Sequence, residues 1–148
     1  DDAAGSIEYF LYVYRYTGME KALELVERAK DMLEEEGLIV EEANDGTIAV
    51  EKISNSKPGD FDFVLMDVQM PFMDGYTATQ TIRQLKNKQL ANIPIIAMTA
   101  NAFEEDKKKA IESGMDAHLS KPIQPALLFS TISEIISKSE NESNQKER

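Results

Sequence analysis

Short uninterrupted apolar runs alternate along this chain with segments in which apolar residues recur at helical spacing. The longest runs are Phe63–Met66 and Ile93–Met98, and such runs are typical of strands buried on both faces of a parallel sheet. Leu38–Val40 and Ala117–Leu119 are shorter or more mixed, which indicates strands nearer an edge. With Ile7–Tyr16 counted as the first, the pattern predicts five strands.

The segments between these runs have the spacing of amphipathic helices. Apolar residues recur every three or four positions over residues 19–36, after Asn44-Asp45-Gly46, over 78–85 and over 128–136. A fifth helix is predicted over Glu104–Ser113, where acids precede bases and Gly114 ends the helix. Its apolar face is thin, with Phe103, Ala110 and Ile111 and little else, so we expect it to be held loosely. Strand–helix alternation at this spacing predicts an α/β fold with a doubly wound parallel sheet.

Composition excludes several classes of protein. The chain has no cysteine, so disulfides and thiolate metal sites are ruled out, and its single histidine disfavours a zinc site. A net charge of −11 disfavours nucleic acid as a direct partner. No apolar run approaches the roughly 20 residues of a membrane span, and no signal-peptide pattern opens the sequence. We therefore expect one cytoplasmic domain over residues 1–137 without membrane contact, followed by a polar tail or linker stub over 138–148.

Three polar residues follow three of the predicted strands. Asp67 follows Phe63–Met66, Thr99 follows the next run, and Lys121 follows the last. In an open parallel sheet the loops at the carboxyl ends of the strands form the ligand crevice. A carboxylate, a hydroxyl and an ammonium there suit phosphoryl chemistry, with Asp67 as the nucleophile that forms an acyl phosphate. The same residues are also common as helix caps, strand ends and surface charges, so their spacing alone supports this weakly.

The loops around these residues carry a family resemblance. The motifs are Leu-Met-Asp-Val-Gln-Met-Pro-Phe-Met-Asp-Gly at 65–75, Met-Thr-Ala-Asn-Ala at 98–102 and His-Leu-Ser-Lys-Pro-Ile at 118–123. Together, in this order and at these distances, they closely resemble the loops of two-component receiver domains (response regulators). The residues of these motifs are most similar to those of receivers in hybrid histidine kinases. The resemblance extends from about residue 33 to residue 137 and implies a flavodoxin-like (βα)5 fold with strand order 2-1-3-4-5.

The resemblance also implies roles for individual residues. Asp67 resembles the phosphoacceptor, Lys121 its ion-pair partner, and Thr99 the hydroxyl that shifts toward the phosphoryl group. His118 occupies the place of the rotating ring in the switch. Mg²⁺ would be held by Asp67 and the backbone carbonyl of Gln69. The implied donor is a phosphohistidine on a histidine kinase or histidine phosphotransfer domain, and the implied activity is a signalling switch rather than an enzyme, beyond self-phosphorylation and self-dephosphorylation at Asp67.

The first strand and helix depart from the family pattern. Receivers need an acidic pair at the end of their first strand to complete the metal site, whereas Ile7–Tyr16 is followed by Thr-Gly-Met-Glu. One explanation is that residues 1–36 are divergent or engineered, so that the metal site is impaired and Glu20 serves as a substitute ligand. Alternatively, Asp1 and Asp2 are the acidic pair and an insertion follows them.

This departure keeps other functions open. One is a phosphorylation-impaired pseudo-receiver or an engineered flavodoxin-like scaffold, for which the missing acidic pair is the argument. Another is a phosphatase with an aspartate nucleophile. Such enzymes place a second aspartate two residues after the nucleophile, and Gln69 stands there, which disfavours this class.

Overall fold

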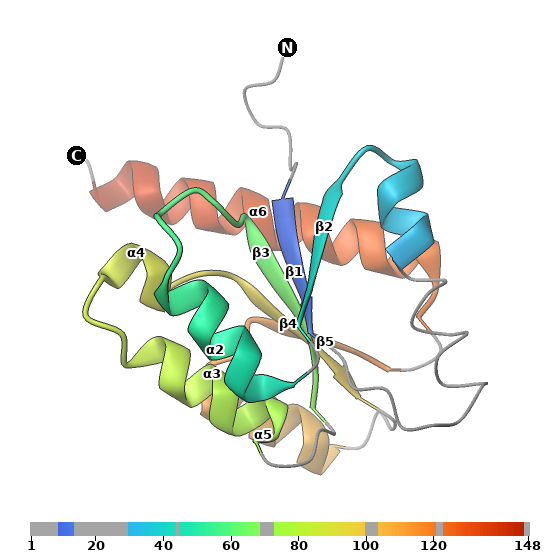
Figure 1. Ribbon diagram of the computed structural model, residues 1–148. Helices are drawn as coiled ribbons and strands as arrows, with labels where there is room; N and C mark the ends of the chain where they lie inside the picture. The colour runs from blue at the N-terminus through green and yellow to red at the C-terminus, as the bar shows by residue number, and fades with distance from the viewer. Residues whose placement is uncertain are drawn as a thin grey trace.

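The computed structural model describes residues 9–13, 30–43, 45–68, 73–99, 104–120 and 123–146, with the backbone alone for 9–13 and 139–146. Five strands form one parallel sheet in the order β2-β1-β3-β4-β5 (Figure 1). They are β1 (Tyr9–Val13), β2 (Ile39–Ala43), β3 (Phe63–Asp67), β4 (Ile95–Thr99) and β5 (Ala117–Ser120). The structure thus confirms the predicted parallel α/β fold and its strand order, with β2 and β5 at the edges.

Helices α2 (Gly46–Ser54), α3 (Gly75–Arg83), α4 (Lys88–Ala91) and α5 (Glu104–Ser113) lie in the connections between successive strands from β2 onward, and α6 (Pro125–Lys146) follows β5. Residues 30–35 before β2 are also helical. Residues 19–29 of the helix predicted over 19–36 lie outside the described residues, and residue 36 is already in the turn before β2. The two ends of the strand predicted over 7–16 also lie outside the described residues. The short helix α4 was not predicted, because one turn is too short to show a hydrophobic period. Asn87 caps it by accepting hydrogen bonds from the backbone of Gln89 and Leu90.

The sheet has helices on both faces (Figure 1). Helices α2, α3 and α5 lie on one side, and α6 lies on the other with the helical residues 30–35. Strand β3 is buried throughout and alternates between two cores. Val64 and Met66 join the core under α2 and α3, whereas Phe63 and Leu65 join the core under α6. Each such buried side chain contributes roughly 1.5–3 kcal/mol, which makes β3 the rigid centre that carries Asp67 at its end.

The edge strand β2 is longer than the predicted Leu38–Val40. It continues through Glu41 and Glu42 to Ala43, because an edge position lets their carboxylates reach solvent. Both carboxylates are paired there: Glu41 with Lys52 of α2, and Glu42 with Lys30.

Helix α6 extends to Lys146, well past residue 138, where a polar tail is predicted to begin. The apolar period ends at Ile136, but residues 126–146 contain neither proline nor glycine, so nothing in them interrupts the backbone hydrogen bonds. The segment expected as a polar tail or linker stub from residue 138 thus continues the helix as far as Lys146. None of the helices in the described part of the chain is long and apolar enough to cross a membrane.

Helix α5 has the bounds that the sequence predicts, and Gly114 ends it with a φ of +104°. Its buried residues are Ala110 and Ser113, whereas Ile111, expected on the apolar face, is 74% exposed. Phe103 lies outside the described residues. The contact between α5 and the sheet is therefore as small as the sequence indicated, and Ile111 does not contribute to it.

Candidate functional site

Asp67 is the last residue of β3, and four apolar residues precede it in the strand. It is 4% exposed, which is low for an aspartate. The parallel pairing with β4 continues just past it, where the Val68 amide donates to the Met98 carbonyl at 3.1 Å. Asp67 thus lies at a strand end whose backbone is hydrogen-bonded to β4 both before and after this residue.

Thr99 ends the neighbouring strand β4 and is 1% exposed. Asp67 pairs with Met98 in the register of the two strands, so Thr99 lies one residue farther along. Because successive side chains alternate between the faces of a strand, Asp67 and Thr99 belong to opposite faces of the sheet. A group that contacts both must therefore lie over the strand ends, which is where ligands bind in open parallel sheets.

His118 lies on the edge strand β5 and is half-buried. It pairs with Ala97, and Thr99 pairs with Ser120. His118 therefore shares a sheet face with Thr99 and is its diagonal neighbour on the adjacent strand. The structure brings the hydroxyl and the imidazole of the predicted switch to one face, on adjacent strands.

The first turn of α3 presses against the backbone of the site. A Cβ atom added at Gly75 would lie 2.5 Å from the carbonyl oxygen of Asp67 and 2.8 Å from the Cα atom of Val68. The Gly75 amide donates to the Val68 carbonyl at 3.2 Å, and Asp74 caps the helix by accepting from the Thr77 amide at 2.8 Å. Only glycine allows this approach. Gly75 lies in the motif at 65–75, but no local pattern in the sequence predicts this contact.

The remaining predicted site residues, Lys121, Gln69 and Glu20, lie outside the described residues, as do Asp1 and Asp2. Within the described ranges no three acidic or histidine side chains come close enough to hold a metal ion. The Asp67 carboxylate is a hard oxygen donor of the kind that Mg²⁺ prefers, so the one predicted side-chain ligand that is described has suitable chemistry.

Tyr76 follows Gly75 on α3, and its hydroxyl oxygen is buried without a hydrogen-bond partner among the described residues. Burial raises the pKa of Tyr76, and the nearby carboxylates of Asp106 and Asp74 raise that pKa further. A buried hydroxyl without a partner is costly for the folded state.

Replacing Tyr76 with phenylalanine should therefore raise the free energy of unfolding by about 1 kcal/mol at pH 7, measured by urea denaturation. Above pH 10 the unfolded chain loses the phenolic proton before the folded protein does, so wild-type stability should fall as pH rises further. The other tyrosines are common to both proteins, so the difference between the two pH profiles isolates Tyr76. A variant less stable than the wild type would contradict the prediction.

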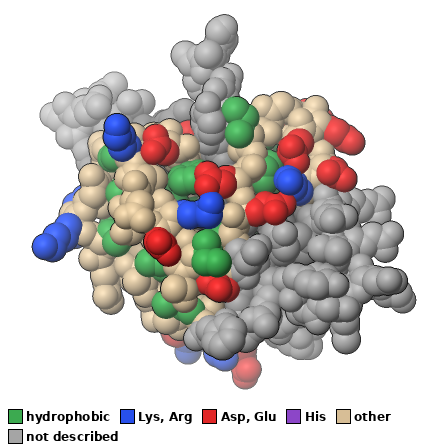
Figure 2. Space-filling model, viewed as in Figure 1, with side chains coloured by type: hydrophobic (Ala, Val, Ile, Leu, Met, Phe, Trp, Pro, Cys, Tyr) green, Lys and Arg blue, Asp and Glu red, His purple; other side chains and the backbone are tan. Residues whose placement is uncertain are grey.

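An open hollow of about 790 Å³ lies elsewhere, between the edge strand β2 and helix α2. Ile39, Ile48 and Phe61 supply apolar side chains to its lining, and the Glu41–Lys52 ion pair also lines it. Figure 2 shows acidic and basic side chains intermixed on this face of the molecule. None of the predicted site residues lines this hollow, so its size does not identify it as the site of phosphoryl chemistry.

Comparison with known sequences identifies relatives over most of the chain. The sequence model of the response regulator receiver domain family matches residues 20–133 of this chain. Histidine kinase 1 of Arabidopsis thaliana is 48% identical over 92 residues, which are 62% of this chain and 8% of that protein. The sensor histidine kinase RcsC of Escherichia coli is 43% identical over 102 residues, 69% of this chain and 10% of that protein. The chain thus spans about a tenth of the length of these curated relatives.

Solved structures agree with these matches. The receiver domain of the sensor histidine kinase PA1611 from Pseudomonas aeruginosa superposes with a TM-score of 0.70 at 29% identity, covering 88% of this chain and 98% of that one. That structure has a magnesium ion coordinated in its active-site cleft. A putative response regulator from Chloroflexus aurantiacus gives a TM-score of 0.74 at 25% identity, covering 88% and 98% of the two chains.

Proposed function

This chain belongs to the response regulator receiver domain family, and we propose that it accepts a phosphoryl group on Asp67. The observation that carries the proposal is a buried carboxylate at the carboxyl end of the central strand β3, with Thr99 at the end of the adjacent strand β4. The donor is a phosphohistidine on a histidine kinase or a histidine phosphotransfer domain. The domain works in the cytoplasm and contacts neither nucleic acid nor membrane.

The transfer forms one bond and breaks one bond. A carboxylate oxygen of Asp67 attacks phosphorus, the nitrogen–phosphorus bond of the donor breaks, and the leaving imidazole keeps the electron pair and binds a proton. The Thr99 hydroxyl donates a hydrogen bond to a phosphoryl oxygen, and the Lys121 ammonium pairs with the negative charge. Asp67, the Gln69 carbonyl and Glu20 would hold Mg²⁺, which when bound neutralises charge on the transferring group.

The change is reported through the face that Thr99 shares with His118. As the Thr99 hydroxyl moves toward the phosphoryl group, the space it leaves on that face admits the imidazole of His118. Helix α5 lies on the same side of the sheet and buries few residues, so it adjusts at low cost. The proposed output is an altered surface around α5, β5 and α6, with no turnover beyond self-phosphorylation and self-dephosphorylation.

Intact mass of the wild-type chain after incubation with acetyl phosphate tests the proposal. We expect a single phosphoryl adduct that forms with Mg²⁺ and is absent when EDTA replaces the metal, because the acidic chain repels the donor without a cation. Circular dichroism on the same samples reports whether the protein is folded. Folded protein that gains no adduct with Mg²⁺ would contradict the proposal.

A second candidate is a pseudo-receiver or scaffold that keeps the fold without the chemistry. The missing acidic pair after the first strand favours it. Titration with Mg²⁺, followed by the amide resonances of Asp67 and Val68, separates the two candidates. Saturable binding in the low millimolar range or tighter supports a receiver that can be phosphorylated, and the absence of any shift supports the scaffold.

A further inference from the structure

We propose that Gly46, at the start of α2, is a positioning residue for Asp67, an inference that rests on the proposed phosphoacceptor function. Gly46 belongs to neither of the strands that carry Asp67 and Thr99. It acts through Met73 and Gly75, which hold the start of α3 against the backbone of the acceptor. Its substitution should therefore alter phosphoryl transfer in a protein that remains folded.

The contact between Gly46 and Met73 leaves no room for a side chain. A Cβ atom added at Gly46 would lie 2.6 Å from the carbonyl oxygen of Met73, 3.1 Å from its Cγ atom and 3.2 Å from the Cβ atom of Ala78. The first of these atoms is backbone and cannot rotate away as the end of a side chain can. Since contacts below 3.0 Å essentially never occur for a real Cβ atom, Met73 or α2 would have to shift.

Helix α2 is poorly placed to yield, because its start is held by a cap. Asp45 accepts a hydrogen bond from the Ile48 amide at 2.9 Å through its side chain and from the Ala49 amide at 3.1 Å through its carbonyl. Ala49 and Ile53 of the same helix are fully buried against the sheet. A side chain at Gly46 is therefore expected to move Met73 rather than the helix.

Two peptide bonds connect Met73 to Gly75, the residue that contacts the backbone of Asp67. Asp74 caps α3, and Gly75 lies against the Asp67 carbonyl with space for no more than a hydrogen atom. A displacement of Met73 is thus passed to Gly75 and then to Asp67. Catalytic groups need placement within about 0.5 Å, and an error of about 1 Å can cost a hundredfold in rate. The simpler reading, that Gly46 merely lets α2 and α3 pack closely, predicts lower stability with unchanged chemistry.

The test compares Gly46→Ala with wild type and with Thr47→Ala, an exposed neighbour on the same helix. Labelling by acetyl phosphate is followed by intact mass at saturating Mg²⁺, at a temperature where all three proteins are folded. In Gly46→Ala the maximal labelling rate should fall about tenfold, while the half-saturating acetyl phosphate concentration changes less than about threefold. Thr47→Ala should stay within about twofold of wild type. Gly46→Ala that is folded and labels like wild type would overturn the proposal.

Amide chemical shifts give a readout that does not depend on phosphorylation. In Gly46→Ala we expect shifts at Met73, Gly75 and Asp67, and their absence at Gly75 and Asp67 would also overturn the proposal. If wild type itself is not labelled, the proposed function fails. The amide shifts then show by themselves whether Gly46 controls the position of Asp67. If Gly46→Ala does not fold, Met73→Ala takes its place, since it removes the Met73 Cγ atom that lies beside Gly46 without adding atoms. That variant should also shift the amides of Gly75 and Asp67 and label about threefold more slowly, and unchanged amides would overturn the proposal.

Discussion

Replacing Asp67 with asparagine should abolish the phosphoryl adduct that acetyl phosphate and Mg²⁺ produce in the wild-type chain. The substitution keeps the size of the side chain at a position that is 4% exposed, so the packing at the end of β3 is preserved. It replaces the nucleophilic carboxylate with an amide, which does not form an acyl phosphate. The expected signal is complete loss of the adduct in intact mass, from a protein with an unchanged circular dichroism spectrum.

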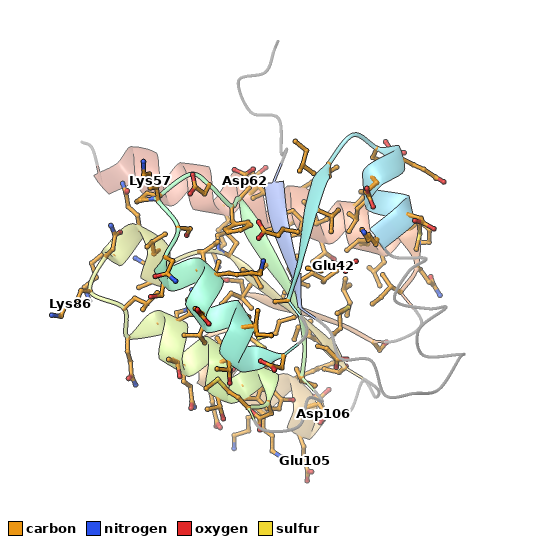
Figure 3. The ribbon with its side chains drawn as sticks, viewed as in Figure 1. Glu42, Lys57, Asp62, Lys86, Glu105 and Asp106 are labelled. Carbon is orange, nitrogen blue, oxygen red and sulfur yellow. The ribbon has the colours of Figure 1, made fainter. Side chains whose placement is uncertain are left out.

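Asp60→Asn provides the matched control for this loss. Asp60 is exposed in the connection between α2 and β3, where it accepts a hydrogen bond from the Lys57 amide at 2.9 Å. Lys57 and Asp62 of this connection lie at the opposite end of the sheet from Glu105 and Asp106 at the start of α5 (Figure 3). The control makes the same chemical change and retains an acceptor oxygen, so its labelling should match wild type. An adduct that persists in Asp67→Asn would show that another side chain is the acceptor.

Arg83 holds together several segments at the amino end of β4. From the last turn of α3, its guanidinium donates to the carbonyl oxygens of Ala91 at 2.6 Å, Ile93 at 2.7 Å and Gly114 at 2.9 Å. It also pairs with Asp116 at 3.0 Å, and the same carboxylate oxygen accepts from the Ile95 amide at 2.8 Å. Burial lowers the pKa of Arg83, and Asp116 opposes that shift. One side chain therefore satisfies acceptors at the end of α4, before β4 and after α5.

Replacing Arg83 with methionine should lower the free energy of unfolding by about 3–5 kcal/mol, measured by urea denaturation. Methionine retains most of the apolar stem but leaves three carbonyl groups and the Asp116 carboxylate without the donors of the guanidinium. The side chain of Arg83 is 20% exposed, so water replaces those donors only in part. A decrease below about 1 kcal/mol would contradict this role.

Two further variants test whether the loss of stability comes from the directed hydrogen bonds of the guanidinium, from its charge, or from any substitution on helix α3. Arg83→Lys keeps the charge but has one nitrogen in place of three, so it should recover less than half of the lost stability. Gln80→Ala changes an exposed residue of the same helix and should alter stability by less than about 0.5 kcal/mol. Full recovery by lysine would assign the effect to charge rather than to the directed hydrogen bonds.

Local patterns in the sequence determined the central sheet and the candidate acceptor. The uninterrupted apolar runs before Asp67 and Thr99 became β3 and β4, both buried throughout, because a strand covered on two faces needs apolar residues at every position. The acid-to-base order in Glu104–Ser113 and the glycine after it marked α5 to the residue. These features depend on neighbours in the chain, so they are readable without the fold. The roles of Lys121, Gln69 and Glu20 stay predictions.

Other features became visible only in the folded protein. Helix α4 and the extension of α6 have no hydrophobic period to announce them, and the exposure of Ile111 depends on what lies opposite α5. Gly46 meets Met73, and Arg83 meets Gly114 and Asp116, across separations of about 30 residues. The sequence around either residue of such a pair does not predict its contact with the other. Local sequence patterns therefore predicted the strands, helices α2, α3 and α5, and the strand end at which Asp67 lies. Long-range packing decided which side chains hold Asp67 and its sheet in place, because such contacts exist only after the strands have paired.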